Sequence, residues 1–283
     1  MSGESGGTLY VVGTPIGNLE DITERALRVL GEVDLVLAED TRRVRKLLSS
    51  LGLATAVESY HGDTTADKRA RLVRRMAEGA TFALASDAGT PVVADPGASI
   101  VAEAAEAGVR IVPIPGPSAV AAALSVSGLR GDRYEFAGYA PRRRQERQEF
   151  LRRIARSPVT SVFYETPHRL RDCLDDLVAV AGPDQPLVVC RELTKMYEEI
   201  LRLTAAEAVT HFTAHEPRGE FTLLLPPGEG EDGHTGPSDE QLREAAEQLL
   251  AMGAGTRDAA DLLSKLTGRA RNDLYQMLLD LRG

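Results

Sequence analysis

Three turns rich in glycine and proline are the parts of the sequence best suited to hold a small molecule. They occupy residues 13–18 (GTPIGN), 87–91 (DAGTP) and 115–119 (PGPSA), and each follows a short apolar run that predicts a β-strand. In an open α/β sheet, ligands bind beyond the carboxyl ends of the strands, where glycine lets the backbone approach. One such turn alone is most simply a turn. Three at equivalent positions indicate one shared site, suited to stacking and backbone hydrogen bonds with a nucleoside.

Other known ligand-binding motifs are either absent from the sequence or stand where the neighbouring residues do not support binding. Residues 228–233 (GEGEDG) match G-x-G-x-x-G, but no helix follows at once and three acids would repel a pyrophosphate. The sequence contains no G-x-x-x-x-G-K-[ST] and no G-x-S-x-G, which excludes P-loop NTPases and the common serine hydrolases. His211 and His215 lie one helical turn apart, but no further ligand stands at useful spacing. Two partly exposed helix histidines are the simpler interpretation.

The strands and helices predicted around these turns indicate an α/β fold. In the first part of the chain, short apolar runs alternate with helical stretches, one of them from about residue 21 to 30. This alternation predicts βαβ units and a mostly parallel sheet. The predicted strands are residues 9–12, 34–38, 81–85 and 110–114.

A second α/β unit follows, in which Ser118 is a candidate cap for the next, alanine-rich segment. Its later strands are joined by short turns, so we expect antiparallel pairs there. The predicted strands are residues 159–164, 187–190, 199–203 and 220–225.

The last part of the chain predicts a small helical unit. Residues 226–237 contain no apolar side chain and read as a linker, and residues 238–241 (SDEQ) fit a capping box. Three helices then follow, the first ended by Gly253 and Gly255, which makes a unit of helix-turn-helix size. Its acidic first helix argues for packing or docking rather than DNA reading. The predicted divisions are therefore residues 1–116 and 117–226 (two α/β domains), 227–238 (linker) and 239–283 (helical domain).

Composition places the chain among soluble, reduced proteins. It has 283 residues, 43% of them hydrophobic, and two cysteines, which cannot form a disulfide framework. No apolar run approaches the roughly 20 residues that a membrane span needs. The first eight residues lack the basic and apolar regions of a signal peptide. We expect a cytoplasmic protein with no membrane association.

The net charge of −9 hides an asymmetry. Residues 1–156 balance at +1 and residues 157–283 at −10. The arginines of the first part are clustered near residues 42–46, 68–75 and 142–153. Any single cluster is most simply a solvated helix face. Three clusters in a locally neutral half keep a polyanion such as RNA open as a partner.

Seven short motifs occur in one order along the chain, and together they resemble those of a known enzyme family. The chain closely resembles the 16S ribosomal RNA 2′-O-ribose methyltransferase I family, the RNA-modifying branch of the tetrapyrrole-methylase (class III) methyltransferases. The likeness runs from about Thr8 to Leu225 and is weaker in the helical C-terminus. The motifs are residues 13–18, 39–43 (EDTRR), 61–63 (HGD), 86–91 with 95–97 (SDAGTP and DPG), 115–119, 163–169 (FYETPHR) and 191–195 (RELTK).

The resemblance implies two α/β domains with S-adenosylmethionine (SAM) as methyl donor in the cleft between them, and a homodimer. It implies methylation of a cytidine ribose 2′-hydroxyl in the decoding region of 16S rRNA, in the small ribosomal subunit, without a metal. Porphyrin-methylating relatives carry G-G-D-P where this chain has residues 88–91 (AGTP), which favours the RNA branch.

Carried over by position, the resemblance also implies a set of cofactor contacts. Pro15 would line the cofactor cleft. Ser118 and Ala119 would contact the methionine or ribose end, and Tyr164 and Leu193 would lie beside the adenine. The main cofactor loop would contribute Ala88, Gly89, Thr90 and Val93.

Methyl transfer from a sulfonium to a hydroxyl is an in-line displacement, so positioning supplies much of the catalysis. A nearby base, or a cation that stabilises the developing alkoxide, should help a poorly nucleophilic ribose hydroxyl. The candidates are Asp40 and Glu192 as base and Arg191 or Lys195 as cation. The alternative is that these acids and cations are salt-bridge partners.

Basic residues are the candidates for RNA contact. The arginines expected to reach phosphates are Arg42, Arg43, Arg142, Arg143 and Arg144. His61 and His168 could act as bases, but each fits better as an RNA contact or a hydrogen-bonded turn residue. Two other functions stay open, a methyltransferase of this fold acting on a tetrapyrrole or other small molecule, and a non-catalytic ribosome assembly factor.

Overall fold

The computed structural model describes residues 7–228, 239–267, 269 and 271–281. The described residues of 1–154 and 160–226 form one compact unit, and those of 155–159 and 227–283 form a second. No described helix is long and apolar enough to cross a membrane. The predicted boundary between two α/β domains at residue 116 stays a prediction.

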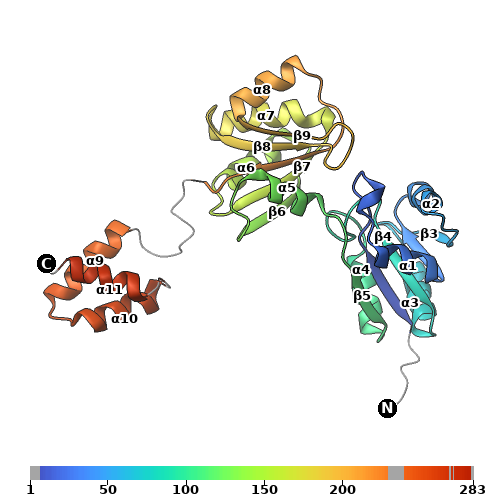
Figure 1. The fold of residues 1–283 in the computed structure, drawn as a ribbon, viewed down its shortest axis with the longest axis horizontal. Helices are drawn as coiled ribbons and strands as arrows, with labels where there is room; N and C mark the ends of the chain where they lie inside the picture. Colours follow the sequence, from blue (N-terminus) through green and yellow to red (C-terminus); the bar gives the residue numbers. More distant parts are fainter. Residues whose placement is uncertain (1–6, 229–238, 268, 270, 282–283) are drawn as a thin grey trace, which may run out of the picture. The chain divides into compact units, whose positions relative to one another are not determined.

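The first sheet is wholly parallel, as the sequence predicts (Figure 1). Its strand order is β3-β2-β4-β1-β5. The strands are β1 (Thr8–Val12), β2 (Leu35–Ala38), β3 (Val57–Ser59), β4 (Thr81–Ala85) and β5 (Arg110–Ile114). The sequence analysis missed β3, because three residues are too few to display a period of two.

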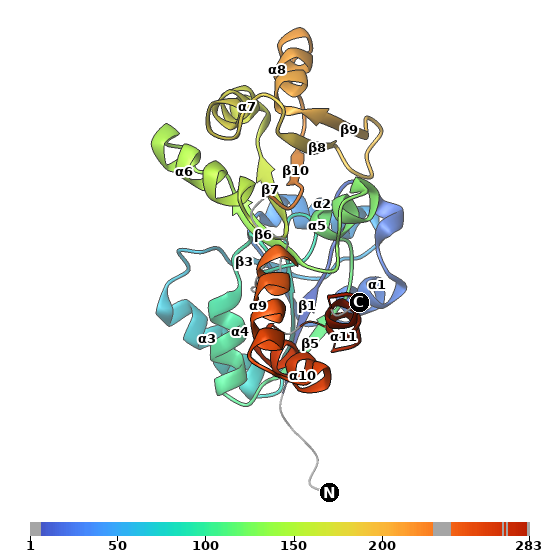
Figure 2. The same cartoon turned by 90° about the vertical axis from the view of Figure 1, so that its left-hand side faces the viewer.

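Helices cover both faces of this sheet. On one face, α1 (Glu24–Glu32) and α2 (Thr41–Ser50) pack in a core that contains Val36. On the other, α3 (Ala66–Ala77) and α4 (Ala98–Glu106) pack in a core that contains Leu37. Figure 2 shows α3 and α4 on one side and α1 on the other. Successive residues of β2 therefore serve opposite cores, as the pleat of a strand requires.

The first helix begins later than predicted. Residues Leu19–Asp21 form a short 3-10 helix, and α1 starts only at Glu24. The Thr23 hydroxyl accepts a hydrogen bond from the amide of Ala26 at 3.0 Å and so caps the helix. A side chain that satisfies a free amide of the first turn fixes where a helix starts, and threonine at position 23 does so here.

The second sheet is mixed, with the strand order β6-β7-β10-β8-β9. Its strands are β6 (Tyr134–Tyr139), β7 (Thr160–Glu165), β8 (Pro186–Arg191), β9 (Glu199–Thr204) and β10 (Phe221–Leu225). The pairs of β10 with β7 and β8, and of β8 with β9, are antiparallel as predicted, whereas β6 and β7 are parallel. The sequence analysis missed β6, whose register shifts between Phe136 and Tyr139. Such a bulge interrupts the alternation that marks a strand.

Four helices accompany the second sheet, α5 (Ala119–Ser127), α6 (Arg144–Ala155), α7 (Pro167–Ala181) and α8 (Ala205–Ala214). Ser118 stands at the N-cap of α5 as predicted, but its side chain makes no capping hydrogen bond. Val120 and Ala123 of α5 share a buried cluster with Val162 of β7 and Leu224 of β10. The helix that follows the third turn is thus anchored on the second sheet.

The C-terminal unit contains the three predicted helices, α9 (Asp239–Ala251), α10 (Thr256–Thr267) and α11 (Arg271–Asp280). They share a small apolar core that includes Leu242, Ala260 and Leu278. Helix α9 ends at Ala251, just before the predicted stop at Gly253. Most of the predicted linker, the start of the capping box and most of the G-x-G-x-x-G match lie outside the described residues.

Two glycines bring the ends of β1 and β5 into backbone contact. A Cβ added to Gly13 would lie 2.8 Å from the Cα of Gly116, and one added to Gly116 would lie 2.8 Å from the carbonyl oxygen of Gly13. The neighbour in each case is backbone, which cannot move aside as a flexible side chain can. Only glycine fits this crossing.

We expect Gly13→Ala to lower the free energy of unfolding by about 1–3 kcal/mol, the cost typical of overpacking. Gly131→Ala is the matched control, because a Cβ there has no heavy atom within 4 Å. Urea denaturation of the three proteins measures the difference. Equal midpoints for wild type and Gly13→Ala would contradict a tight crossing.

Candidate active site

The three glycine- and proline-rich turns are hydrogen-bonded to one another. The Thr14 amide donates to the carbonyl of Gly89 at 2.9 Å, and the Gly89 amide donates back to Thr14 at 3.1 Å. The buried Thr14 hydroxyl also donates to the Ser86 carbonyl at 3.2 Å. Thr90 links the third turn, since its hydroxyl donates to the carbonyl of Pro117 at 3.2 Å. The structure thus brings together the turns that follow β1, β4 and β5.

A cavity of about 300 Å³ lies beside these turns. That volume is at the lower end of the range for small-molecule sites. Seven of the nine residues predicted to contact a cofactor line it: Ala88, Gly89, Thr90, Val93, Ser118, Ala119 and Tyr164. Pro15 does not line it but adjoins Ile16, which does. Leu193 is buried in the cluster that also contains Ile16, with Tyr164 packed against it. Sequence reasoning missed the lining residues of the second sheet other than Tyr164, among them Tyr139 and Thr222.

Aromatic rings form one wall of the cavity. The ring of Tyr164 lies 4.8 Å from that of Phe136 and 5.3 Å from that of Tyr139, centroid to centroid. Burial raises the pKa of Tyr164 to about 12, and the charges of Tyr139 and Asp95 act in the same direction. The phenol therefore stays neutral and offers a flat apolar face with one hydroxyl, which suits a planar heterocycle.

Glycine backbone also lines the cavity, at Gly89. Gly89 has a φ of +86°, and a Cβ there would lie 3.3 Å from Cγ2 of Ile16. Glu165, also in the lining, is almost fully buried. One of its oxygens accepts from the Thr166 amide at 2.7 Å and pairs with Arg169, but Oε2 has no partner among the described residues. An aromatic ring together with a glycine backbone in the lining fits a nucleoside-like ligand.

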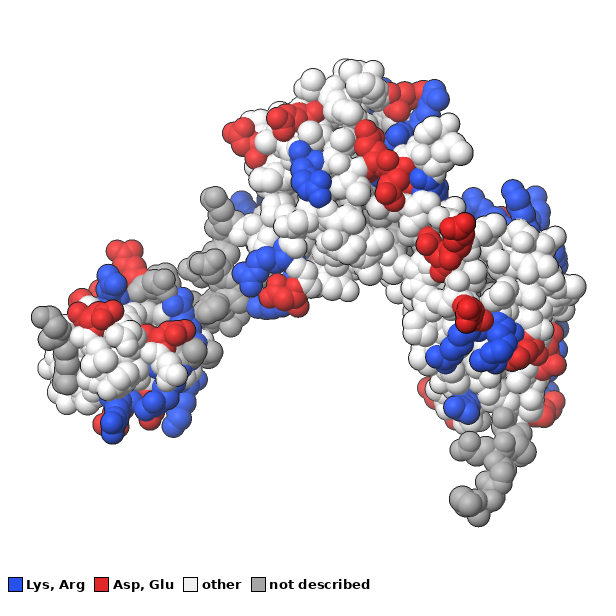
Figure 3. All heavy atoms as spheres, in the orientation of Figure 1, with Lys and Arg blue, Asp and Glu red and all other residues white. Residues whose placement is uncertain are grey.

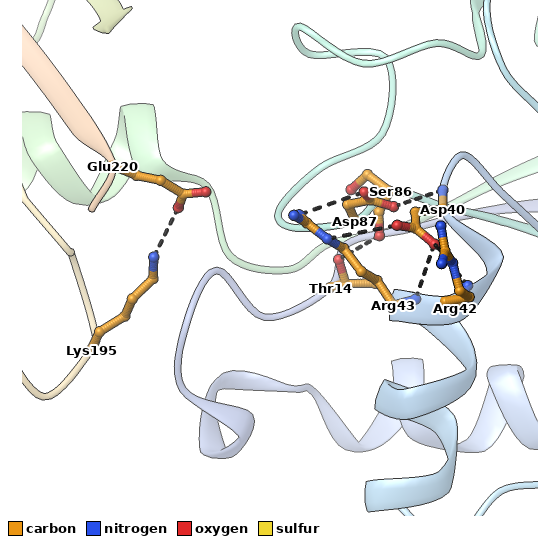
Figure 4. A network of polar contacts seen from close by, with 8 residues as sticks. All are labelled: Thr14, Asp40, Arg42, Arg43, Ser86, Asp87, Lys195 and Glu220. Carbon is orange, nitrogen blue, oxygen red and sulfur yellow. Dashed lines mark hydrogen bonds and ion pairs between the residues drawn. The ribbon is translucent and has the colours of Figure 1, made fainter. Parts of the chain in front are cut away.

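Asp40, predicted as a base, is the N-cap of α2. Its Oδ1 accepts from the amides of Arg42 at 2.9 Å and Arg43 at 3.4 Å (Figure 4). The Arg42 amide holds the pKa of this carboxyl below its usual range, and the Arg43 amide and both arginine charges add to the effect. Asp40 is not among the residues that line the cavity. Its predicted catalytic role stays a prediction.

Glu192 and Arg191, the other predicted catalytic residues, each lie in an ion pair outside the cavity lining. Arg191 pairs with Glu199 at 3.1 Å. Glu192 accepts from the Lys195 ammonium at 2.7 Å. Burial acts to raise the pKa of Glu192, but the hydrogen bonds from Lys195 and from the Glu220 amide outweigh it and leave the pKa lowered. The same ammonium donates to the Glu220 carboxylate at 2.9 Å, and Glu220 does line the cavity (Figure 4).

Comparison with known proteins finds matches over nearly the whole chain. Residues 8–209 match the family model described as Tetrapyrrole (Corrin/Porphyrin) Methylases, and residues 237–282 match the model described as RsmI C-terminal HTH domain. Proteins named "Ribosomal RNA small subunit methyltransferase I" are similar over nearly their full length. The one from Halalkalibacterium halodurans is 40% identical over 276 residues, which is 96% of this chain and 94% of the relative. The one from Synechocystis sp. is 41% identical over 275 residues, 97% and 98% of the two chains.

The chain belongs to the ribosomal RNA small subunit methyltransferase I family. The sequence-based identification of the family and of a methyltransferase is thereby confirmed.

Solved structures show the fold of this family member at lower identity. A uroporphyrin-III C-methyltransferase from Thermus thermophilus, solved with S-adenosylhomocysteine, has a TM-score of 0.54 at 22% identity and covers 79% of this chain and 98% of its own. Diphthine synthase has a TM-score of 0.60 at 17% identity, covering 77% and 90%. At these identities the likeness establishes the tetrapyrrole methylase fold and no more.

The arginines expected to contact RNA in this methyltransferase differ in their exposure and in their ion-pair partners. Side chains of Arg42 and Arg43 are 92% and 67% exposed, and Arg43 lines the cavity with its guanidinium 3.7 Å from Asp87. Arg142 is exposed, and Arg143 makes an exposed pair with Glu146. On the face of the α/β unit drawn in Figure 3, basic and acidic side chains are interspersed.

Arg144 is also exposed, at 76%, but its guanidinium pairs with Asp176, a residue with 2% exposure. Asp176 accepts from Arg144 Nε at 3.0 Å and from Gln148 Nε2 at 2.7 Å, and it pairs with Arg147 Nη2 at 2.7 Å. Burial acts to raise the pKa of Asp176, but these hydrogen bonds outweigh it and lower the pKa. Arg144 therefore helps to hold α6 on α7, whatever it does for RNA.

The four histidines considered in the sequence lie apart from the cavity lining. His61 and His168 are exposed. His215 lies one turn after His211, with Nδ1 3.0 Å from the His211 carbonyl and the two rings stacked. Within the described part of the chain, no group of three or more metal-ligating side chains occurs.

Asp176→Ala should lower the free energy of unfolding by about 3 kcal/mol, because it leaves the buried Arg147 guanidinium without its partner. Asp175→Ala, the exposed neighbour on the same helix, is the matched control. Because the folded-state pKa of Asp176 is lowered, its contribution is present above the unfolded pKa and is lost as the pH falls through the folded pKa. Urea denaturation at pH 7 and at pH 3 measures both effects. Equal stability of the two variants at pH 7 would contradict the cluster's importance.

Proposed function

We propose that this protein transfers the methyl group of SAM to the ribose 2′-hydroxyl of a cytidine in the decoding region of 16S rRNA. The observation that carries the proposal is the identity of about 40%, over almost the whole chain, with proteins named for methylation of small-subunit ribosomal RNA. The cavity supports it, because its size and lining suit a nucleoside.

The cavity residues would divide the binding of SAM between them. Tyr164 offers a ring for the adenine, and Ser118 and Thr222 in the lining bring polar groups to the cavity. Gly89 and Ala88 line the cavity with no side chain or a small one, and Ser118 stands at the N-cap of α5. SAM brings a methyl group on a positively charged sulfur, so these residues need only orient it toward an incoming hydroxyl.

The RNA would be held by positive charge at the cavity and around it. Arg43 lies both in the lining and on the exposed start of α2, next to Arg42. Arg142 and Arg143, with the exposed His61 and His168, would extend this contact to more of the phosphate backbone. The homodimer implied by the family resemblance belongs to the same proposal, and sedimentation velocity tests it.

Tritium transfer from labelled SAM to small ribosomal subunits tests the function. We expect label to enter subunits from a strain that lacks this gene, at an alkali-resistant linkage, and not to enter subunits from the wild type. Absence of label with SAM still bound would favour a small-molecule substrate. Absence of both would leave a non-catalytic assembly factor.

The double variant Arg142→Glu/Arg143→Glu should lower methylation at limiting subunit concentration at least tenfold. Each lost phosphate contact removes counterion release, so the salt dependence of subunit binding should also become shallower. Affinity for SAM, measured by calorimetry, should not change, because neither residue lines the cavity.

Arg28→Glu/Arg130→Glu is the control for this variant. It makes the same change in charge at exposed arginines that pair with Glu32 and Asp132. If the control lost as much methylation as the test variant, general charge rather than a contact at residues 142 and 143 would be responsible.

A further inference from the structure

The loop between β8 and β9 exposes two large apolar side chains. Met196 and Tyr197 are 89% and 68% exposed, more than any other large apolar residue described in the compact unit of residues 1–154 and 160–226. Tyrosine and methionine are enriched in contact surfaces, where they supply a large area that water leaves readily. Two such side chains, adjacent in one loop, indicate a binding surface.

The backbone of this loop is held in a fixed and costly conformation. Glu192 and Thr194 have φ angles of +50° and +67°, which residues with a Cβ rarely adopt. Such a conformation persists only where the surrounding contacts impose it. Here the Thr194 amide donates to the Glu198 carboxylate at 2.6 Å, and the Lys195 ammonium donates to Glu192 at 2.7 Å. The exposed side chains therefore stand on an ordered loop, and a partner that binds them does not have to order it.

The same loop lies against the wall of the cavity. The Lys195 ammonium donates to Glu220, a lining residue, at 2.9 Å (Figure 4). The stem of Lys195 also packs on Gly17, where an added Cβ would lie 2.3 Å from the lysine Cγ. Gly17 follows Ile16, which lines the cavity. The two exposed residues come directly after Lys195, so an RNA strand that brings one ribose to the cavity has its neighbouring nucleotides close to them.

The charges of the loop are matched by one another. Arg191 pairs with Glu199 at 3.1 Å, and Lys195 lies between Glu192 and Glu220. A phosphate is bound by cations that give up counterions, and these two cations are already engaged by carboxylates. The loop therefore suits an uncharged, flat surface such as a nucleobase rather than the phosphate backbone.

We propose that Tyr197, with Met196 beside it, stacks on an unpaired base of the rRNA next to the nucleotide that is methylated. This inference rests on the proposed function. Single-stranded RNA is recognised largely by stacking of its bases on aromatic side chains, which needs no charge. The polarizable thioether of methionine also packs well against a ring. The stack holds the RNA strand in register at the cavity, and residues 191–195, the motif RELTK, brace the loop that presents it.

Steady-state methylation tests the proposal with the full-length chain, labelled SAM and small subunits from a strain that lacks the modification. Tyr197→Ala should raise the subunit concentration at half-maximal rate at least fivefold, roughly the lower limit for losing one stacked base. Tyr197→Phe and Tyr197→Trp should stay within twofold of wild type, because each keeps a ring.

Two further measurements on Tyr197→Ala distinguish stacking from other roles. Its affinity for SAM, measured by calorimetry, should stay within twofold of wild type, because Tyr197 does not line the cavity. The salt dependence of subunit binding should keep its wild-type slope, since a stacked base releases no counterions. The variant at Arg142 and Arg143 should instead change that slope.

Tyr134→Ala is the matched control, because Tyr134 is another tyrosine of the second sheet, 48% exposed and outside the cavity lining. Wild-type kinetics of Tyr197→Ala would overturn the proposal, and so would equal losses in Tyr134→Ala or in the Phe and Trp variants. A changed sedimentation coefficient of Tyr197→Ala would also overturn it, since the loop would then be a contact between copies of the chain. A wild-type enzyme that binds SAM but labels no subunits would overturn the proposed function, and the stacking on rRNA with it.

Discussion

The exchange of backbone hydrogen bonds between Thr14 and Gly89 is the contact on which the site depends. It joins the turn after β1 to the turn after β4, and the buried Thr14 hydroxyl reinforces it through the Ser86 carbonyl. On the other side of β1, the backbones of Gly13 and Gly116 touch. The end of β1 is therefore fixed to both neighbouring strands. The cavity wall formed by residues 88–93 and 118–119 has its shape because these three strand ends cannot separate.

Charged side chains of the same type have different roles in this protein, and the sequence alone does not distinguish these roles. Arg142, Arg143 and Arg144 are consecutive, chemically identical and all exposed, yet the third pairs with a carboxylate of 2% exposure while Arg143 pairs with the exposed Glu146. The same holds for acids. Asp40, Asp87 and Asp95 all follow strands of the first sheet, and they serve as a helix cap, an ion-pair partner and an unpaired cavity group. Their partners, set by tertiary contacts, decide what each can do.

Much of the fold could be predicted from sequence because its signals are local. A strand such as residues 81–85 can be predicted because it is a short apolar run followed by a glycine-rich turn. The ordered motifs identified the family. What escaped prediction lacks such a signal. Strand β3 has three residues, and β6 contains a register shift. In the site, the turns could be predicted to meet, whereas the contributions of Tyr139 and Thr222 depend on how the second sheet approaches them. The raised pKa of Asp95, about 6, likewise arises from burial and from the charges of Glu39 and Asp87, which lie near it in the fold.

The mutual bracing of the three turns has a thermodynamic consequence. A loop that must become ordered around a ligand loses backbone entropy, on the order of 1 kcal/mol or more for each residue fixed, and that loss is subtracted from affinity. Here the turns are already tied by Thr14, Gly89, Thr90 and Pro117. A ligand entering the cavity meets walls whose order was established when the chain folded. The backbone entropy of these turns is therefore lost when the chain folds and not when the ligand binds, so this loss does not reduce the affinity for the ligand.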